Sequence, residues 1–142
     1  MAEAQARPQP EKTPVGIRTP LRLGQGSSGL FEVHSDLGKT IKDNLRNLLL
    51  THRGERLMFT DLGADLRSLL TELQDDGDVT ALTQIGNTVA RYMPFIRLET
   101  MIPKVKHSDN ERSAKVSIII AYSVPSLGLS DQAVQVELNF MG

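Results

Sequence analysis

The spacing of apolar residues in this sequence changes once, at Pro94. Between residue 35 and Pro94 apolar side chains recur every three or four positions, and after Pro94 they alternate with polar ones. The first spacing is typical of amphipathic helices, and the second is typical of strands with one buried face. A chain of 142 residues has about the length of one domain. The order of the two patterns predicts an α+β fold: three amphipathic helices, then an antiparallel sheet of about three strands, with the helices packed on one face.

Three segments in the first part of the sequence have helical spacing. The first is expected to begin after an N-cap at Ser35, and the second after a cap provided by Thr60 or Asp61. The third is expected over residues 78–93, directly before a proline. Gly86 lies inside this third helix, where glycine costs about 1 kcal/mol relative to alanine. We therefore expect the helix to pack closely against a neighbour at Gly86.

Alternating residues define the expected strands. The clearest alternation covers residues 114–123, and two further strands are expected over 96–102 and 134–140. Pro103 follows the first of these strands and cannot donate to a sheet ladder, which predicts a bulge or an edge position. The apolar positions of the last strand are Val134, Val136, Leu138 and Phe140.

Residues 1–29 differ in composition from the rest of the chain. They hold four of the seven prolines and few apolar side chains, which disfavours both a helix and an independent core. We interpret them as a flexible or extended N-terminal arm, followed by a single domain at residues 30–142. Gly24, Gly26 and Gly29 match the letters of the dinucleotide-binding fingerprint, but no convincing strand precedes them and no helix begins at their end. A flexible hinge is the better interpretation of these glycines.

The composition excludes several classes of function. A formal net charge of −1 argues against a dedicated nucleic-acid-binding protein, and the absence of cysteine excludes disulfides, thiol catalysis and zinc–cysteine sites. No apolar run approaches the length of a membrane helix, and the N-terminus lacks the apolar stretch of a signal peptide. The histidines lack the spacing of metal ligands, so we expect no metal or cofactor; they are His34, His52 and His107.

Acidic side chains near the first loop leave one catalytic class open. A glycoside hydrolase needs two carboxyl groups on either side of a sugar-sized cleft, one of them with a raised pKa. The candidates are Glu55, Asp61, Asp65 and Glu72. Because acidic residues are also favoured at helix starts by the helix dipole, these carboxylates do not by themselves predict catalysis. We therefore expect no catalytic residue.

One stretch of the sequence resembles a known family. It is Leu49-Leu50-Thr51-His52-Arg53-Gly54-Glu55-Arg56, followed after a short loop by Leu62-Gly63-Ala64-Asp65-Leu66. Together with the order of helices and strands around it, this stretch resembles the baseplate wedge proteins of contractile-tailed bacteriophages, which have relatives in type VI secretion baseplates. The resemblance covers roughly residues 30–142.

The resemblance implies a structural subunit rather than an enzyme. It implies binding to the other wedge proteins and to the tail sheath protein, whose assembly it would start by strand pairing, with the tail tube or hub as further contacts. It also implies a place in the virion tail baseplate, assembly in the bacterial host cytoplasm, several symmetric copies, and neither nucleic-acid nor membrane partners. The family has also been labelled lysozyme-like, so a peptidoglycan-cleaving hydrolase of the tail is the alternative. A phage tail, a tailocin-like particle and a secretion machine all remain open as the parent machine.

The resemblance also implies two sets of contact residues. The expected wedge interface consists of Gly54, Glu55, Arg56, Met93, Pro94 and Phe95. The family usually has Glu-Pro-Arg where this chain has Met93-Pro94-Phe95, so we expect an apolar docking point. The expected sheath interface consists of Val134, Val136, Leu138 and Phe140. Purely structural roles stay open for both sets: a helix C-cap with a local ion pair at residues 54–56, and an ordinary internal strand at residues 134–140.

Overall fold

The computed structural model describes residues 13–25, 29–66, 79–107 and 113–141. The chain divides into two compact units, Met1–Asp43 and Asn44–Gly142. The elements in order are β1 (Gly16–Ile17), β2 (Val33–His34), α1 (Leu37–Leu50), α3 (Val79–Tyr92), β3 (Arg97–His107), β4 (Ser113–Val124), the 3-10 turn η3 (Pro125–Leu127) and β5 (Leu129–Met141). Helix α1 crosses the division between the units. The predicted boundary between an arm at residues 1–29 and a domain at 30–142 stays a prediction.

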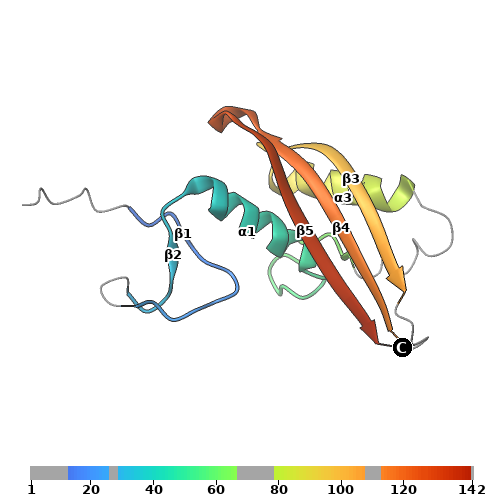
Figure 1. Ribbon diagram of the computed structural model, residues 1–142, viewed down its shortest axis with the longest axis horizontal. Coiled ribbons are helices and arrows are strands. Elements are labelled where there is room, and N and C mark those ends of the chain that lie inside the picture. Colours follow the sequence, from blue (N-terminus) through green and yellow to red (C-terminus); the bar gives the residue numbers. More distant parts are fainter. Residues whose placement is uncertain (1–12, 26–28, 67–78, 108–112, 142) are drawn as a thin grey trace, which may run out of the picture. The chain divides into compact units, whose positions relative to one another are not determined.

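The second unit contains an antiparallel sheet of three strands in the order β3-β4-β5 (Figure 1). Alternate residues of β4 point into the core, as the sequence pattern predicts, and Ile118 and Ile120 are fully buried. Their register partners in β5 are Val136 and Val134, which are buried with them. Pro103 lies inside β3, an edge strand, and the irregular pairing falls earlier, between Leu98 and Thr100. The antiparallel α+β architecture is therefore confirmed.

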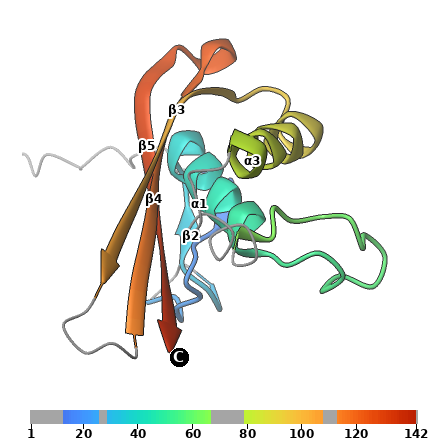
Figure 2. The same ribbon diagram turned by 90° about the vertical axis from the view of Figure 1, so that its right-hand side faces the viewer.

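Helix α3 and residues 44–50 of α1 lie on the same side of this sheet (Figure 2). Both segments turn an apolar face inward, and their fully buried side chains include Leu45, Leu49, Ile85 and Val89. The core of the second unit consists of these side chains and the inward face of β4 and β5.

The expected number of helices is not matched, because the described residues contain two helices where we expected three. The missing one falls largely on residues 67–78, which lie outside the described residues. Its expected start at Thr60 or Asp61 is wrong, since residues 60–65 are not helical and Leu66 is the first helical residue. Gly63 and Asp65 have φ values of 121° and 48°, which a right-handed helix does not accommodate.

The start and the end of α1 also differ from the prediction. Asp36, rather than Ser35, caps the helix, because its Oδ1 accepts a hydrogen bond from the Gly38 N–H at 2.9 Å. The helix ends at Leu50. Gly54 therefore belongs to the loop beyond the helix and is not its C-cap.

The expectation of close packing at Gly86 is wrong, and this leads to a testable prediction. A Cβ atom built at Gly86 would meet nothing within 4 Å outside its own helix. Replacing Gly86 with alanine is therefore expected to stabilise the protein by about 0.5–1 kcal/mol, because alanine loses less backbone entropy in a helix. Urea unfolding of the variant beside the unmodified protein measures the change, and a destabilised variant would contradict the prediction.

The first unit contains a two-stranded antiparallel ribbon that the sequence pattern did not predict. Residues Gly16 and Ile17 pair with His34 and Val33, and an isolated bridge joins Leu23 and Phe31 further along. The Gly24 N–H donates to the Leu30 carbonyl at 3.0 Å, so the glycine-rich segment connects two antiparallel strands. A dinucleotide-binding fingerprint instead connects a strand to a helix, and this segment lacks that arrangement.

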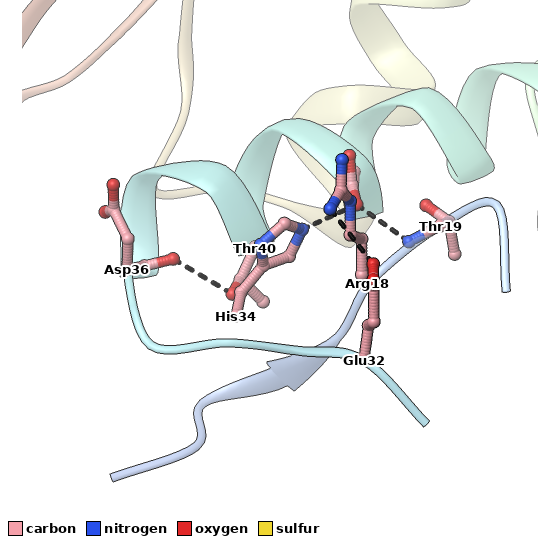
Figure 3. A network of polar contacts seen from close by, with 7 residues as sticks. Arg18, Thr19, Glu32, His34, Asp36 and Thr40 are labelled. Atoms are coloured by element: carbon pink, nitrogen blue, oxygen red, sulfur yellow. Dashed lines mark hydrogen bonds and ion pairs between the residues drawn. The ribbon is translucent and has the colours of Figure 1, made fainter. Parts of the chain in front are cut away.

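Asp43 of α1 holds this ribbon through polar contacts with Thr19 and His34, which are labelled in Figure 3. Its carboxylate accepts a hydrogen bond from the Thr19 backbone N–H at 2.9 Å and lies 2.9 Å from Nε2 of His34. Gly16 packs directly on α1, because a Cβ atom there would come within 2.6 Å of the Thr40 methyl group. One face of the ribbon is therefore fastened to the helix by polar contacts.

The contacts of Asp43 make attachment of the ribbon dependent on pH. Burial alone would raise the pKa of Asp43, but hydrogen bonds from Thr19 and His34 outweigh burial and lower this pKa below 3.8. Because the pKa is lowered in the folded state, the carboxylate stabilises the ribbon above about pH 3.8. This stabilisation is lost as the pH falls through the lowered pKa.

Replacing Asp43 with asparagine is expected to loosen the ribbon by roughly 1–3 kcal/mol, because two hydrogen bonds to a charged acceptor are weakened. Limited proteolysis within residues 13–25 should then accelerate at neutral pH, while the sheet stays protected. Asp36→Asn is the matched control, since asparagine caps a helix as well as aspartate does. Equal cleavage rates in the two variants would contradict the assigned role of Asp43.

Candidate assembly surfaces

The loop that follows α1 is fixed at its base. The Asp65 N–H donates to the Thr51 carbonyl at 3.4 Å, and Nδ1 of His52 lies 2.8 Å from Oδ1 of Asp65. Gly63 packs so closely here that a Cβ atom would overlap the Thr51 carbonyl oxygen. Both ends of the loop are therefore joined to each other where it leaves the helix.

The returning side of the loop is tied to the end of α3. Oδ2 of Asp61 lies 2.6 Å from Nη2 of Arg91, and the Tyr92 hydroxyl donates a hydrogen bond to the same carboxylate. This bond, aided by the charge of Arg91, lowers the pKa of Asp61 despite partial desolvation. Burial and the Asp61 contact raise the pKa of Tyr92. Because Arg91 and Asp61 are largely exposed, the contact fixes the geometry of the loop more than it adds stability.

A cavity of about 380 Å³ opens beside this contact and includes half of the expected wedge interface. Arg56, Met93 and Phe95 line it together with apolar, hydroxyl and amide side chains: Asn44, Asn47, Leu48, Thr51, Leu62 and Tyr92. Met93 is only 7% exposed and belongs to the core, whereas Phe95 is 44% exposed. Pro94 is exposed and does not line the cavity. Phe95 is therefore the more exposed of the two aromatic side chains that line this site, since Tyr92 is partly buried.

Gly54 and Glu55 do not line the cavity and instead shape the loop. Gly54 has φ of +87°, and its N–H donates to the Thr60 carbonyl at 2.7 Å across the loop. The Glu55 carboxylate accepts a hydrogen bond from the His52 backbone N–H at 3.0 Å. The structure gives Glu55 a backbone amide of this loop as its local partner, where a local ion pair was the structural alternative. Contact of residues 54–56 with a wedge protein stays a prediction.

The expected sheath residues lie on β5, at an edge of the sheet. Val134 and Val136 are buried against the core, Leu138 is partly buried, and the side chain of Phe140 lies outside the described part of the structure. Glu137 points to the other face, where its carboxylate lies 2.8 Å from Nζ of Lys115. The side chains of β5 therefore anchor the strand, and its backbone is the part that a partner strand could bind.

The acidic side chains considered for hydrolysis have structural partners. Glu55 accepts a backbone hydrogen bond, Asp61 binds Arg91 and Tyr92, and Asp65 pairs with His52; Glu72 lies outside the described residues. A general acid needs a raised pKa, whereas the pKa of Asp61 is lowered. Within the described ranges, no three His, Asp or Glu side chains gather as metal ligands would, and no helix is long and apolar enough to span a bilayer.

Two solved structures resemble this chain in fold. One is a protein from Geobacter sulfurreducens named as a tail lysozyme, with a TM-score of 0.53 and 22% identity over 78% of this chain and 95% of the other. The second belongs to the baseplate of the anti-feeding prophage, with a TM-score of 0.60 and 18% identity over 76% of this chain and 82% of the other. A comparison with curated protein sequences found no match.

The family of this chain is assigned from a match to a family model and not from these two similar folds. The model is that of the baseplate wedge protein gp25, and it matches residues 35–127 of the 142. The matched range contains the loop after α1, the cavity beside Phe95, and strands β3 and β4, whereas β5 lies beyond it. Because more than half of the sequence matches, the chain belongs to the baseplate wedge protein gp25 family.

Proposed function

We propose that this chain is a structural wedge subunit that binds neighbouring wedge proteins beside Phe95 and starts sheath assembly by strand pairing at β5. Membership of the family supports the general part of this proposal, namely that the chain is a structural component of a contractile-tail baseplate and works among other baseplate proteins. The sheath protein is the proposed partner of β5, and the tail tube or hub is a further contact. Several symmetric copies would assemble with these partners in the bacterial host cytoplasm.

The observation that carries the sheath proposal is the contrast between the two edges of the sheet. Edge strands that do not pair with a partner are usually protected by lysine, proline or a bulge. Strand β3 has all three: Pro103, two lysines (Lys104 and Lys106), and irregular pairing after Leu98. Strand β5 has thirteen residues and contains neither lysine nor proline, and its own irregular pairing is confined to its beginning, between Leu129 and Gln132. The rest of β5 therefore lacks the features that protect β3, which supports pairing with a partner strand there.

Phe95 supports the wedge part of the proposal. It is exposed at a cavity that Met93 and Leu62 also line, and aromatic and methionine side chains are enriched at the cores of interfaces. A partner side chain that enters this cavity would contact Phe95 and remove it from water. The family usually has charged residues where this chain has Met93 and Phe95. An apolar contact at this place would suit the two uncharged side chains.

Two neighbouring proline substitutions test the sheath proposal. Successive N–H groups of a strand point to opposite sides, so of Gln135 and Val136 one donates to β4 and the other faces the open edge. Proline removes one N–H group in each variant. One of Gln135→Pro and Val136→Pro should unfold the sheet, and the other should stay folded yet fail to seed polymerisation of the sheath protein.

Gln135→Ala and Val136→Ala are the controls, because they change the same side chains and keep both N–H groups. Circular dichroism establishes which proline variant is folded, and sedimentation of polymerised sheath measures seeding. A folded proline variant that seeds sheath at the rate of its alanine control would refute strand pairing at β5.

A further inference from the structure

Three consecutive apolar side chains form the tip of the loop after α1. Leu57 is 96% exposed, Met58 is 89% exposed and Phe59 is 59% exposed. Figure 2 shows this loop, drawn in green, projecting away from α3 and from the sheet. Contiguous exposed apolar side chains of this size mark interaction sites in soluble proteins.

The backbone of this tip is organised before any partner binds. The Phe59 N–H donates to the Arg56 carbonyl at 3.2 Å, and the Leu62 N–H donates to the Phe59 carbonyl at 3.0 Å. Behind the tip, the Gly54 N–H and the Thr60 carbonyl close the loop at 2.7 Å. These turns order the backbone of the tip, which reduces the loop entropy that is lost on binding.

Charges around the tip are distributed unequally. Arg53 and Arg56 are exposed on one side of the tripeptide. The two carboxylates of the loop are turned to its base, because Glu55 accepts the His52 N–H and Asp61 binds Arg91. The apolar tip is therefore bordered by two exposed cationic side chains, of which Arg53 also interacts electrostatically with the Asp61 carboxylate.

We propose that the loop 53–61 is a preformed plug that inserts Leu57, Met58 and Phe59 into an apolar, acid-rimmed pocket of a neighbouring protein subunit. The inference rests on the proposed function, because it requires the chain to work inside an assembly. The three tip residues do not line the cavity beside Phe95, whereas Arg56 of the same loop does, so the tip is a contact surface next to that cavity. Methionine, aromatic residues and arginine are enriched in protein interfaces, which favours a protein over a lipid surface.

A photo-crosslinking amino acid at position 58 of assembled particles tests the plug directly. The control position is Leu127 of η3, an exposed apolar residue on another element. The expected product joins position 58 to one segment of a neighbouring subunit in which Asp or Glu residues flank apolar ones. A crosslink yield no higher than at position 127, or a crosslinked segment without acidic residues, would overturn the proposal.

Variants separate the plug from simple misfolding. The double variant Leu57→Ser/Met58→Ser should melt at the same temperature as the unmodified protein, since both side chains are exposed in the free chain. Its incorporation into baseplates should fall about tenfold or more, and Arg53→Glu should also reduce it, while Leu127→Ser incorporates normally. Normal incorporation of the double variant would refute the plug.

Two further outcomes distinguish the remaining possibilities. Co-sedimentation of the free protein with phosphatidylglycerol vesicles, lost in the double variant, would assign the tip to a membrane and overturn the protein pocket. Phe95→Ala and the folded β5 proline variant report on the proposed function instead. If these two variants are impaired while the double variant is normal, only the plug proposal fails. If these two variants are normal while the double variant is impaired, the plug proposal stands and the proposed contacts at Phe95 and β5 fail.

Discussion

Replacing Met93 with alanine is expected to lower the free energy of unfolding by about 2–5 kcal/mol, because a buried methionine leaves a cavity in the core. Met93 is nearly inaccessible to water and follows the last turn of α3, where its N–H still donates to the Val89 carbonyl at 2.7 Å. Guanidinium unfolding of the isolated protein measures the loss. A change of less than about 1 kcal/mol would place Met93 outside the core.

Replacing Phe95, two positions after Met93, is expected to affect binding more than stability. Because Phe95 is half exposed, Phe95→Ala should cost the isolated protein much less stability than Met93→Ala. It should instead weaken binding to the wedge proteins by about 1–3 kcal/mol, as expected for an aromatic anchor. Melting of the free variant and its binding to reconstituted wedges are measured in parallel. Lost stability with unchanged binding would show that Phe95 belongs to the core and not to the docking site.

Gly63→Ala is expected to be the most damaging single-methyl change in the loop, at about 2–4 kcal/mol. Gly63 has φ of +121°, and an added Cβ would overlap the Thr51 carbonyl oxygen, so strain and a backbone clash act together. Gly54→Ala is the matched control: its φ of +87° brings strain, but its Cβ would meet nothing within 4 Å. The control should lose about 1–2 kcal/mol. Equal losses in urea unfolding would contradict the close approach at Gly63.

Long elements with one buried face could be predicted from the sequence. The alternation in β4 placed Ile118, Ile120 and Tyr122 on one face, and all three are buried. The bounds of α3 were also predictable, since an acidic residue precedes the helix and Pro94 follows it closely. In both elements a strong period and clear stop signals point to the same structure.

Short elements and exact boundaries could not be predicted. The strands β1 and β2 have two residues each, too few for any period to be visible. Ser35 and Asp36 are both good capping residues, and only the geometry of the first turn selects Asp36. The turn before Leu66 depends on the positive φ of Asp65, which aspartate adopts only when its surroundings require it.

The candidate surfaces were predictable only in part. Met93 and Phe95 were expected to act together, but Met93 is buried and Phe95 is exposed, because the chain turns at Pro94 and Phe95 after the end of α3. The link from Asp61 to Arg91 and Tyr92 joins distant parts of the chain and has no local sequence signal. The apolar tip of the loop does have a local sequence signal, because three large apolar residues follow one another within a polar segment: Leu57, Met58 and Phe59.

A high-resolution reconstruction of the assembled baseplate would show directly whether the sheath starts at β5. We expect a strand of the sheath protein hydrogen-bonded along β5 as a fourth strand of the sheet, while the β3 edge with Pro103 stays unpaired. Density for such a strand beside residues 129–141 would establish this chain as the starting point of the sheath. A β5 edge that faces solvent in the finished particle, or a sheath strand paired with β3 instead, would contradict it.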